Sequence, residues 1–129
     1  MLAVDTNIIV RYLTADDPEQ FAKASALIRD EDVYVCTTVL LETEWALRRG
    51  YRFSRTQIIT ALAAFAGLPR DTLEEPASAA KALDWAQRGM DFADALHLAK
   101  AEGWEAMISF DQRFAAVANT LSEVKVRAP

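Results

Sequence analysis

Short apolar runs alternate with longer helix-type segments along this 129-residue chain. The clearest apolar runs are MLAVD at 1–5, VYVC at 33–36 and AMISF at 106–110. Their lengths and composition are typical of buried strands. Strands that alternate with helices favour a mostly parallel central sheet with helices on both faces. We therefore predict one three-layer α/β/α domain that spans residues 1–129.

Local start and stop signals set the boundaries of the expected elements. Pro18 suits the first turn of a helix, and Gly50, Gly67 and Gly103 each follow a helix-type segment. The predicted strands are 1–5, 33–36, a short edge strand over 71–74, 106–110 and 123–127, and the predicted helices are 7–13, 18–29, 39–49, 56–66, 77–88, 91–102 and a short one after Asp111.

Bulk properties narrow the class of protein. The net charge of −5 argues against a protein that coats nucleic acid through its overall field, although an enzyme with a local basic patch remains possible. Cys36 is the only cysteine, so an internal disulfide is excluded, and we expect a buried thiol at a strand end. We also expect a cytoplasmic protein without a signal peptide or membrane span.

Four acids lie where strands should turn into helices. Asp5 and Asp111 end or follow strands, Glu42 lies in the helix after a strand, and Asp94 lies near a helix start. In parallel sheets ligands bind beyond the carboxyl ends of the strands, so all four could face one rim. Clustered carboxylates repel one another, and a bound Mg²⁺ or Mn²⁺ would compensate them. Zinc is disfavoured, because the chain has one Cys and one His.

Each acid also has a purely structural interpretation. Asp5 and Asp111 could cap the helices that follow them, and Asp91 could be an N-cap with Asp94 at the third helical position. Glu42 shares a helical arc with apolar residues such as Trp45, so we predict that it is buried.

The neighbouring acid of the same helix has a different expected environment. Glu44 is predicted to pair with Arg48 on the surface, and Arg49 is a possible partner for Glu42.

The segments VDTNIIVRYL, LLETEWALR, DFADALHLA and SFDQRF, in this order, resemble the PIN-domain ribonucleases, and most of all the VapC toxins of bacterial toxin–antitoxin pairs. The resemblance covers essentially the whole chain. It implies that the catalytic, metal-binding acids are Asp5, Glu42, Asp94 and Asp111, supported by Thr6, Asn7 and Ser109. Arg113 stands where the family often has another acid, so one bound metal is expected rather than a fully acidic second site.

The resemblance implies Mg²⁺-dependent hydrolysis of RNA phosphodiester bonds, with Mn²⁺ as a substitute, by a toxin that inhibits growth or translation. One carboxylate, such as Glu42, would accept the proton of the attacking water. The implied partners are RNA, a cognate VapB-type antitoxin and a second copy in a homodimer or larger assembly, with no direct DNA binding by this chain alone.

Two further segments have alternative interpretations. The basic stretch RRGYRFSR could bind RNA through Arg48, Arg49, Arg52 and Arg55, or could simply be a solvated helix end. The set Ile58, Ile59, Leu62 and Phe65 could be a contact surface, but core is the better interpretation.

Other classes of protein also gather acids around a metal ion. They are a phosphatase-like domain, a receiver-like signalling domain and a PIN domain that binds without catalysis. The first would normally have an acid at Asn7, and the second a mid-chain Asp and a late Lys, for which no convincing pair is found.

Overall fold

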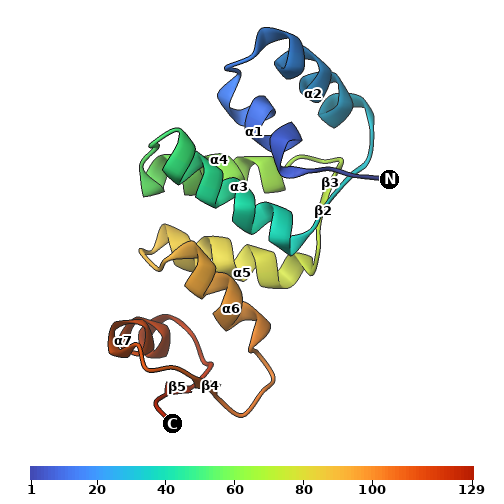
Figure 1. Ribbon diagram of the computed structural model, residues 1–129. Coiled ribbons are helices and arrows are strands. Elements are labelled where there is room, and N and C mark those ends of the chain that lie inside the picture. Colours follow the sequence, from blue (N-terminus) through green and yellow to red (C-terminus); the bar gives the residue numbers. More distant parts are fainter. The chain divides into compact units, whose positions relative to one another are not determined.

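The computed structural model describes all 129 residues and contains seven helices and five short strands (Figure 1). Every element predicted from the sequence is present, although the strands are shorter than expected. In chain order the elements are β1 (Leu2–Ala3), α1 (Thr6–Thr14), α2 (Pro18–Asp30), β2 (Val33–Val35), α3 (Thr37–Gly50), α4 (Arg55–Ala66), β3 (Asp71–Leu73), α5 (Pro76–Gln87), α6 (Phe92–Lys100), β4 (Met107–Ile108), α7 (Gln112–Leu121) and β5 (Val126–Arg127).

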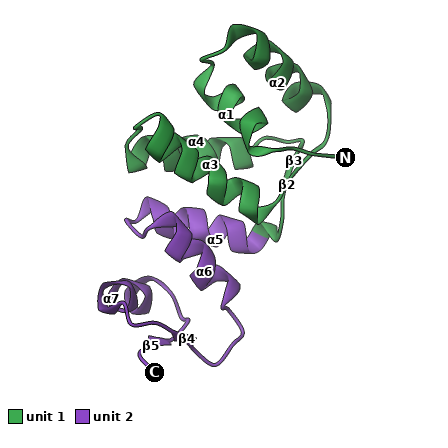
Figure 2. Cartoon of the chain, viewed as in Figure 1, with its two compact units in different colours: residues 1–76 green, residues 77–129 purple.

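The chain forms two compact units, Met1–Pro76 and Ala77–Pro129 (Figure 2). The first unit contains a three-stranded sheet with the order β1-β2-β3, in which both pairs of strands are parallel. Leu2 lies opposite Val33, and Val33 lies opposite Asp71. The central position of β2 explains why Val33 and Val35 are both fully buried. The predicted strand at 71–74 is an edge strand of this sheet, as expected.

Helix ends in the first unit follow the signals in the sequence. Asp17 is the N-cap of α2, where its side chain accepts a hydrogen bond from the Gln20 N–H at 3.0 Å, and Pro18 occupies the first helical position. Ser54 and Gln57 form a reciprocal capping box at the start of α4. Helix α1 ends differently, because its C-cap Ala15 adopts the left-handed conformation with φ of 53°.

The core of the first unit settles one interpretation that the sequence left open. Ile58, Ile59, Leu62 and Phe65 are each at most 2% exposed, so this set belongs to the core. Cys36 follows β2 and is half-buried rather than buried as predicted. None of the helices combines the length and the apolar character needed to cross a membrane.

The predicted orientation of α3 is wrong. Its buried residues are Leu40, Thr43, Glu44 and Leu47, whereas Glu42 is exposed and Trp45 is 54% exposed. The apolar character of Trp45 suggested the wrong arc. Thr43 can lie in the core because its hydroxyl donates to the Val39 carbonyl oxygen at 2.7 Å, which satisfies its polar group. Glu44 does pair with Arg48 at 3.0 Å, as predicted, although its carboxylate is buried rather than solvated.

The second unit consists of α5, α6, α7 and a parallel pair of strands, β4 and β5. Met107 lies opposite Val126, and Ile108 lies opposite Arg127. Both sheets of the chain are therefore parallel, which confirms the predicted α/β class with parallel pairing. The large buried side chains of this unit are Leu83, Trp85, Met90, Phe92, Leu96, Leu98, Phe114 and Val126.

Candidate functional site

In the first unit a buried threonine connects two of the predicted acids. Asp5 is exposed and is the N-cap of α1, where its Oδ1 accepts a hydrogen bond from the Thr6 N–H at 2.7 Å. Thr6 is 8% exposed, and its hydroxyl donates to Glu42 Oε1 of α3 at 2.5 Å. Glu42 does not pair with Arg49. Thr6 therefore donates hydrogen bonds to both acids, through its N–H to Asp5 and through its hydroxyl to Glu42. Asn7, the next residue, is exposed.

In the second unit, Asp91 and Asp94 lie at the start of α6, and the charge of Asp111 also acts on Asp94. Asp91 is the N-cap of α6 and accepts a hydrogen bond from the Asp94 N–H at 3.1 Å, so the predicted capping pair is confirmed. The pKa of Asp94 is raised above its ordinary value, first by burial and then by the negative charges of Asp91 and Asp111. His97, which is exposed one turn further along α6, acts in the opposite direction. Asp94 is therefore held in an electrostatically unfavourable place.

The last acid also caps a helix. Asp111 is the N-cap of α7, where its Oδ1 accepts a hydrogen bond from the Phe114 N–H at 2.9 Å. Its own N–H donates to the Ser109 hydroxyl at 3.0 Å, so Ser109 shapes the turn between β4 and α7. Arg113 lies exposed in the first turn of α7.

The donor set suits a hard cation. Each unit supplies carboxylate and hydroxyl oxygens, and these are the ligands that Mg²⁺ and Mn²⁺ prefer. A cation bound nearby would also offset the negative charges that raise the pKa of Asp94. Neither unit by itself brings three or more His, Cys, Asp or Glu side chains into a group that could hold a metal ion. The four-acid metal site therefore stays a prediction.

The basic segment between α3 and α4 is ordered by its tyrosine. The Tyr51 hydroxyl donates to Asp16 Oδ2 at 2.7 Å and accepts a hydrogen bond from the Arg11 guanidinium at 2.9 Å. The ring of Phe53 stacks on that of Tyr51, with centroids 6.0 Å apart and planes inclined by 5°. Arg52 lies between them with φ of 57°, an uncommon conformation for a residue with a side chain. The loop is therefore held in a defined shape.

The four arginines of this segment are not equivalent. Arg48 is tied to the buried carboxylate of Glu44, and Arg55 also has a partner in the chain. Arg49 and Arg52 are exposed and make no ion pair. Two of the four predicted RNA-binding arginines are thus available to an anionic ligand without breaking an existing contact.

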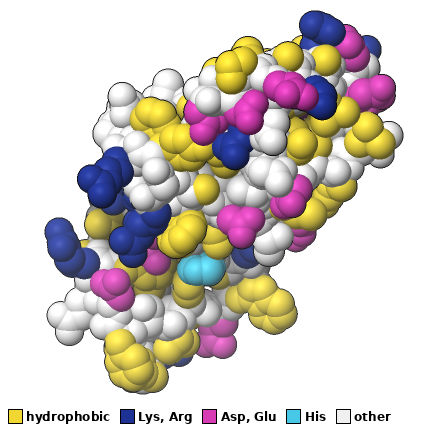
Figure 3. Space-filling view, turned by 45° about the horizontal axis from the view of Figure 1, so that its top comes forward, with side chains coloured by type: hydrophobic (Ala, Val, Ile, Leu, Met, Phe, Trp, Pro, Cys, Tyr) yellow, Lys and Arg dark blue, Asp and Glu magenta, His cyan; other side chains and the backbone are white.

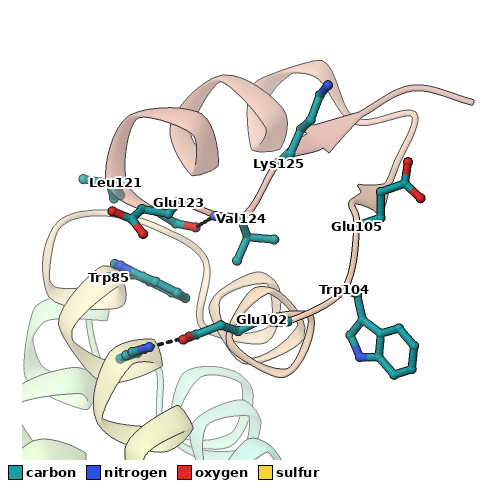
Figure 4. A pocket seen from close by; sticks show the side chains of 11 residues that line it. Trp85, Glu102, Trp104, Glu105, Leu121, Glu123, Val124 and Lys125 are labelled. Carbon is teal, nitrogen blue, oxygen red and sulfur yellow. Dashed lines mark hydrogen bonds and ion pairs between the residues drawn. The ribbon is translucent and has the colours of Figure 1, made fainter.

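One cavity in the second unit, of about 500 Å³, lies apart from the predicted site residues (Figure 4). Trp85 forms one wall, Glu102 points toward Lys81 with which it forms an ion pair, and Trp104 points away from the cavity. None of the four predicted acids lines this cavity. Trp104 and Phe110 are 76% and 86% exposed, and large hydrophobic groups protrude singly from the surface (Figure 3).

Sequence reasoning missed two features of the site. Asp91 was assigned only a capping role, yet its charge also raises the pKa of Asp94. Its spacing of three residues from Asp94 was the available signal. The anchoring of Tyr51 by Asp16 and Arg11 had no such signal, because these residues are separated by 35 and 40 positions in the sequence.

Comparison with known proteins gives a family for this chain. A model of the PIN domain matches residues 2–120, which is nearly the whole sequence. No individual curated protein matches significantly. The seven helices and the parallel strand pairing are consistent with the three-layer α/β/α fold of that domain. PIN domains are generally nucleases that use divalent metal ions. The chain therefore belongs to the PIN-domain family.

Proposed function

We propose that this protein is a Mg²⁺-dependent endoribonuclease that acts as the toxin of a toxin–antitoxin pair. The observation that supports the proposal is the environment of Asp94, whose pKa is raised first by burial and then by the negative charges of Asp91 and Asp111. A partly buried carboxylate with negative neighbours is favoured in its charged form when a cation binds. The PIN-domain match makes a nuclease metal site the natural use of these acids.

The proposal assigns one metal site to four acids and treats residues 1–129 as one domain, because the family model runs through both units. Asp5 and Asp94 would hold Mg²⁺, with Glu42 and Asp111 bound directly or through water. The ion would lower the pKa of a bound water and offset charge on the phosphate. Thr6 would keep Glu42 oriented through its hydroxyl, and Ser109 would keep Asp111 in place through the turn.

The partners follow from the same assignment. Arg48, Arg49, Arg52 and Arg55 would hold the RNA backbone, with the unpaired Arg49 and Arg52 as the main contacts. A cognate VapB-type antitoxin and a homodimer are further proposed partners, in a larger assembly or alone. We also propose that the protein works in the cytoplasm, where its single cysteine would stay reduced.

The first experiment is cleavage of a mixed panel of labelled RNAs with Mg²⁺, with Mn²⁺ and with EDTA. Cleavage should require the metal and disappear in the Asp5→Ala variant. Asp32→Ala is the matched control, because Asp32 is an exposed acid of the same unit whose side chain makes a surface ion pair with Arg70. Metal-independent cleavage, or equal cleavage by Asp5→Ala, would refute the assignment.

A second experiment tests the toxin role. Induced expression of the protein in bacterial cells should arrest growth, whereas the Asp5→Ala variant should not. A protein that binds Mg²⁺ and RNA but neither cleaves RNA nor arrests growth would instead be a binding domain. Arg113, in the place of a frequent acid, is the feature that favours this second candidate.

A further inference from the structure

A small apolar cavity lies beside the basic loop of the first unit. Its volume is about 140 Å³. Its walls come from the end of α1, from α3, from the loop and from α4. We call it the Phe53 slot, and it is lined by Leu13, Leu47, Phe53, Gln57, Ile58 and Ala61. None of these residues belongs to the proposed metal site.

The size of the Phe53 slot limits what can enter it. Pockets that enclose a drug-sized ligand have volumes of roughly 300–1,000 Å³, so about 140 Å³ accommodates one ring system or one side chain. A complete nucleotide would have to leave its sugar and phosphate outside. The occupant is therefore a single flat or apolar group that belongs to a larger molecule.

The aromatic wall of the slot is fixed before any ligand binds. Phe53 is 38% exposed and stacks in parallel on Tyr51, whose hydroxyl is held by Asp16 and Arg11. A ring that is already immobilised loses little conformational freedom when another ring stacks on it. Unstacked RNA bases are commonly recognised by stacking on such aromatic side chains.

Gln57 gives the slot one polar group with a fixed direction. Its side-chain Oε1 accepts a hydrogen bond from the Ser54 N–H at 2.9 Å as part of the capping box. The oxygen is therefore occupied, and the amide NH₂ group remains a hydrogen-bond donor. Nucleobases present ring nitrogens and carbonyl oxygens at their edges, and these accept hydrogen bonds.

The charge beside the slot favours an anionic chain as the ligand. Arg52 directly precedes Phe53, and Arg49 lies at the end of α3, which supplies Leu47 to the wall. Both arginines are exposed and make no ion pair. An aromatic slot with two available guanidinium groups next to it suits a base together with its flanking phosphates.

We propose that the Phe53 slot binds one unpaired nucleobase of a single-stranded RNA, whose phosphates contact Arg49 and Arg52. This inference rests on the proposed ribonuclease function and names a base-binding position for its substrate. Phe53 stacks on the base, the Gln57 amide donates to its edge, and Tyr51 is a positioning residue that acts through Phe53 and the shape of the loop.

The test measures RNA binding in EDTA, so that it does not depend on catalysis. Short single-stranded RNAs of mixed sequence carry the fluorescent base 2-aminopurine, whose emission is quenched when it stacks. The Ala61→Phe variant should fill the slot, abolish the quenching and weaken binding by roughly tenfold, within the range found when base stacking is removed. Ala64→Phe is the matched control, because Ala64 is exposed on the same helix and does not line the slot.

A second pair of variants separates phosphate contacts from base contacts. The double variant Arg49→Ala/Arg52→Ala should bind RNA of every sequence more weakly. The dependence of its affinity on salt concentration should correspond to about two fewer phosphate contacts. The double variant Arg29→Ala/Arg70→Ala is the control, because it removes the same charge at two arginines that are paired with Asp30 and Asp32. It should change the RNA affinity little. Circular dichroism of every variant checks that the fold is retained.

Three results would overturn the proposal. The first is equal RNA binding by Ala61→Phe and Ala64→Phe. The second is equal affinity for an RNA that lacks bases, which would leave only phosphate contacts. The third is unchanged 2-aminopurine emission when the labelled RNA is mixed with the protein, together with binding of an acidic, leucine-containing peptide at the slot. That result would identify a protein partner instead of RNA. RNA binding at the slot without any cleavage would support the slot and refute the ribonuclease function, so the two failures are distinguishable.

Discussion

Substitution of the partly buried Asp71 should stabilise the protein. This residue begins the edge strand β3, opposite the fully buried Val33, and neither of its carboxylate oxygens has a hydrogen-bond partner although both are buried. Burial raises its pKa from 3.8 to about 6. A buried carboxylate without partners is unfavourable in its charged form, because water solvates it better in the unfolded chain.

The pH range of this effect follows from the two pKa values. Below about pH 3.8 the carboxyl group of Asp71 is protonated in both the folded and the unfolded protein, so its ionisation does not lower the stability. As the pH rises to about 6, the unfolded chain releases its proton while the folded protein keeps it, so stability falls. Above about pH 6 the loss is complete. The difference between the two pKa values, at about 1.4 kcal/mol per pH unit, corresponds to a loss of folding free energy of at most about 3 kcal/mol. We expect a loss of about 2 kcal/mol, because Asp71 is only partly buried.

Asp71→Asn removes the charge while keeping the shape of the side chain. Its free energy of unfolding at pH 7, measured by urea denaturation, should exceed that of the natural protein by about 2 kcal/mol, and the difference should vanish near pH 4. Asp32→Asn is the control, because it removes a solvated carboxylate of the same unit whose surface ion pair contributes less than about 1 kcal/mol. A destabilised Asp71→Asn variant, or a gain that is independent of pH, would show that Asp71 is not a strained buried carboxylate.

Three further substitutions test other parts of the structure. Ala15→Gly should raise the free energy of unfolding by about 1 kcal/mol in urea denaturation, since the C-cap of α1 has φ of 53° and glycine adopts this conformation without strain. Arg48→Ala should lower the free energy of unfolding by about 1–2 kcal/mol in the same assay, because the carboxylate of Glu44 would stay buried without its partner. Replacing both Glu44 and Arg48 by leucine should lower it less. Thr6→Val keeps the buried shape but removes the hydrogen bond to Glu42, so the proposed activity should fall by roughly tenfold in kcat while the thermal midpoint changes little; unchanged cleavage would exclude the role of Thr6.

Local chemistry explains why the elements could be predicted. Pro18 at the first position of α2 and the Ser54–Gln57 capping box of α4 act within one helical turn, so the sequence around each helix end contains the whole signal. The strands are shorter than predicted because pairing extends over only two or three residues in each pair. The apolar run AMISF predicted a buried strand, yet Ile108 and Phe110 are 49% and 86% exposed. Strand length, in turn, depends on a partner elsewhere in the chain.

The face of α3 could not be assigned correctly from residue type alone. Trp45 is a large apolar residue that is exposed, and Thr43 and Glu44 are polar residues that are buried. Both polar residues have compensation within one turn of the helix, from the Val39 carbonyl and from Arg48. A spacing of three, four and seven residues from Leu40 would have identified the buried arc, if polarity had been given less weight than periodicity.

Other features differ in whether the sequence contained a signal for them. Asp71 and Leu73 alternate with Thr72 on an edge strand, so period two already places the acid on the face of the buried leucine. The Phe53 slot had no comparable signal. Its lining residues come from separate helices, and the slot exists only where those helices pack.

Capping and metal binding are often treated as competing explanations for an acid at a helix start, and here they are compatible. Asp5 and Asp111 each use Oδ1 to accept a hydrogen bond from a helix N–H, and Asp91 uses Oδ2. A carboxylate has two oxygens and about four acceptor positions, so each of these groups keeps most of its capacity for a cation. The cap also fixes the side chain in one direction, which lowers the entropy lost when an ion binds. Local sequence chemistry that explains an acid structurally is therefore no argument against its use as a ligand.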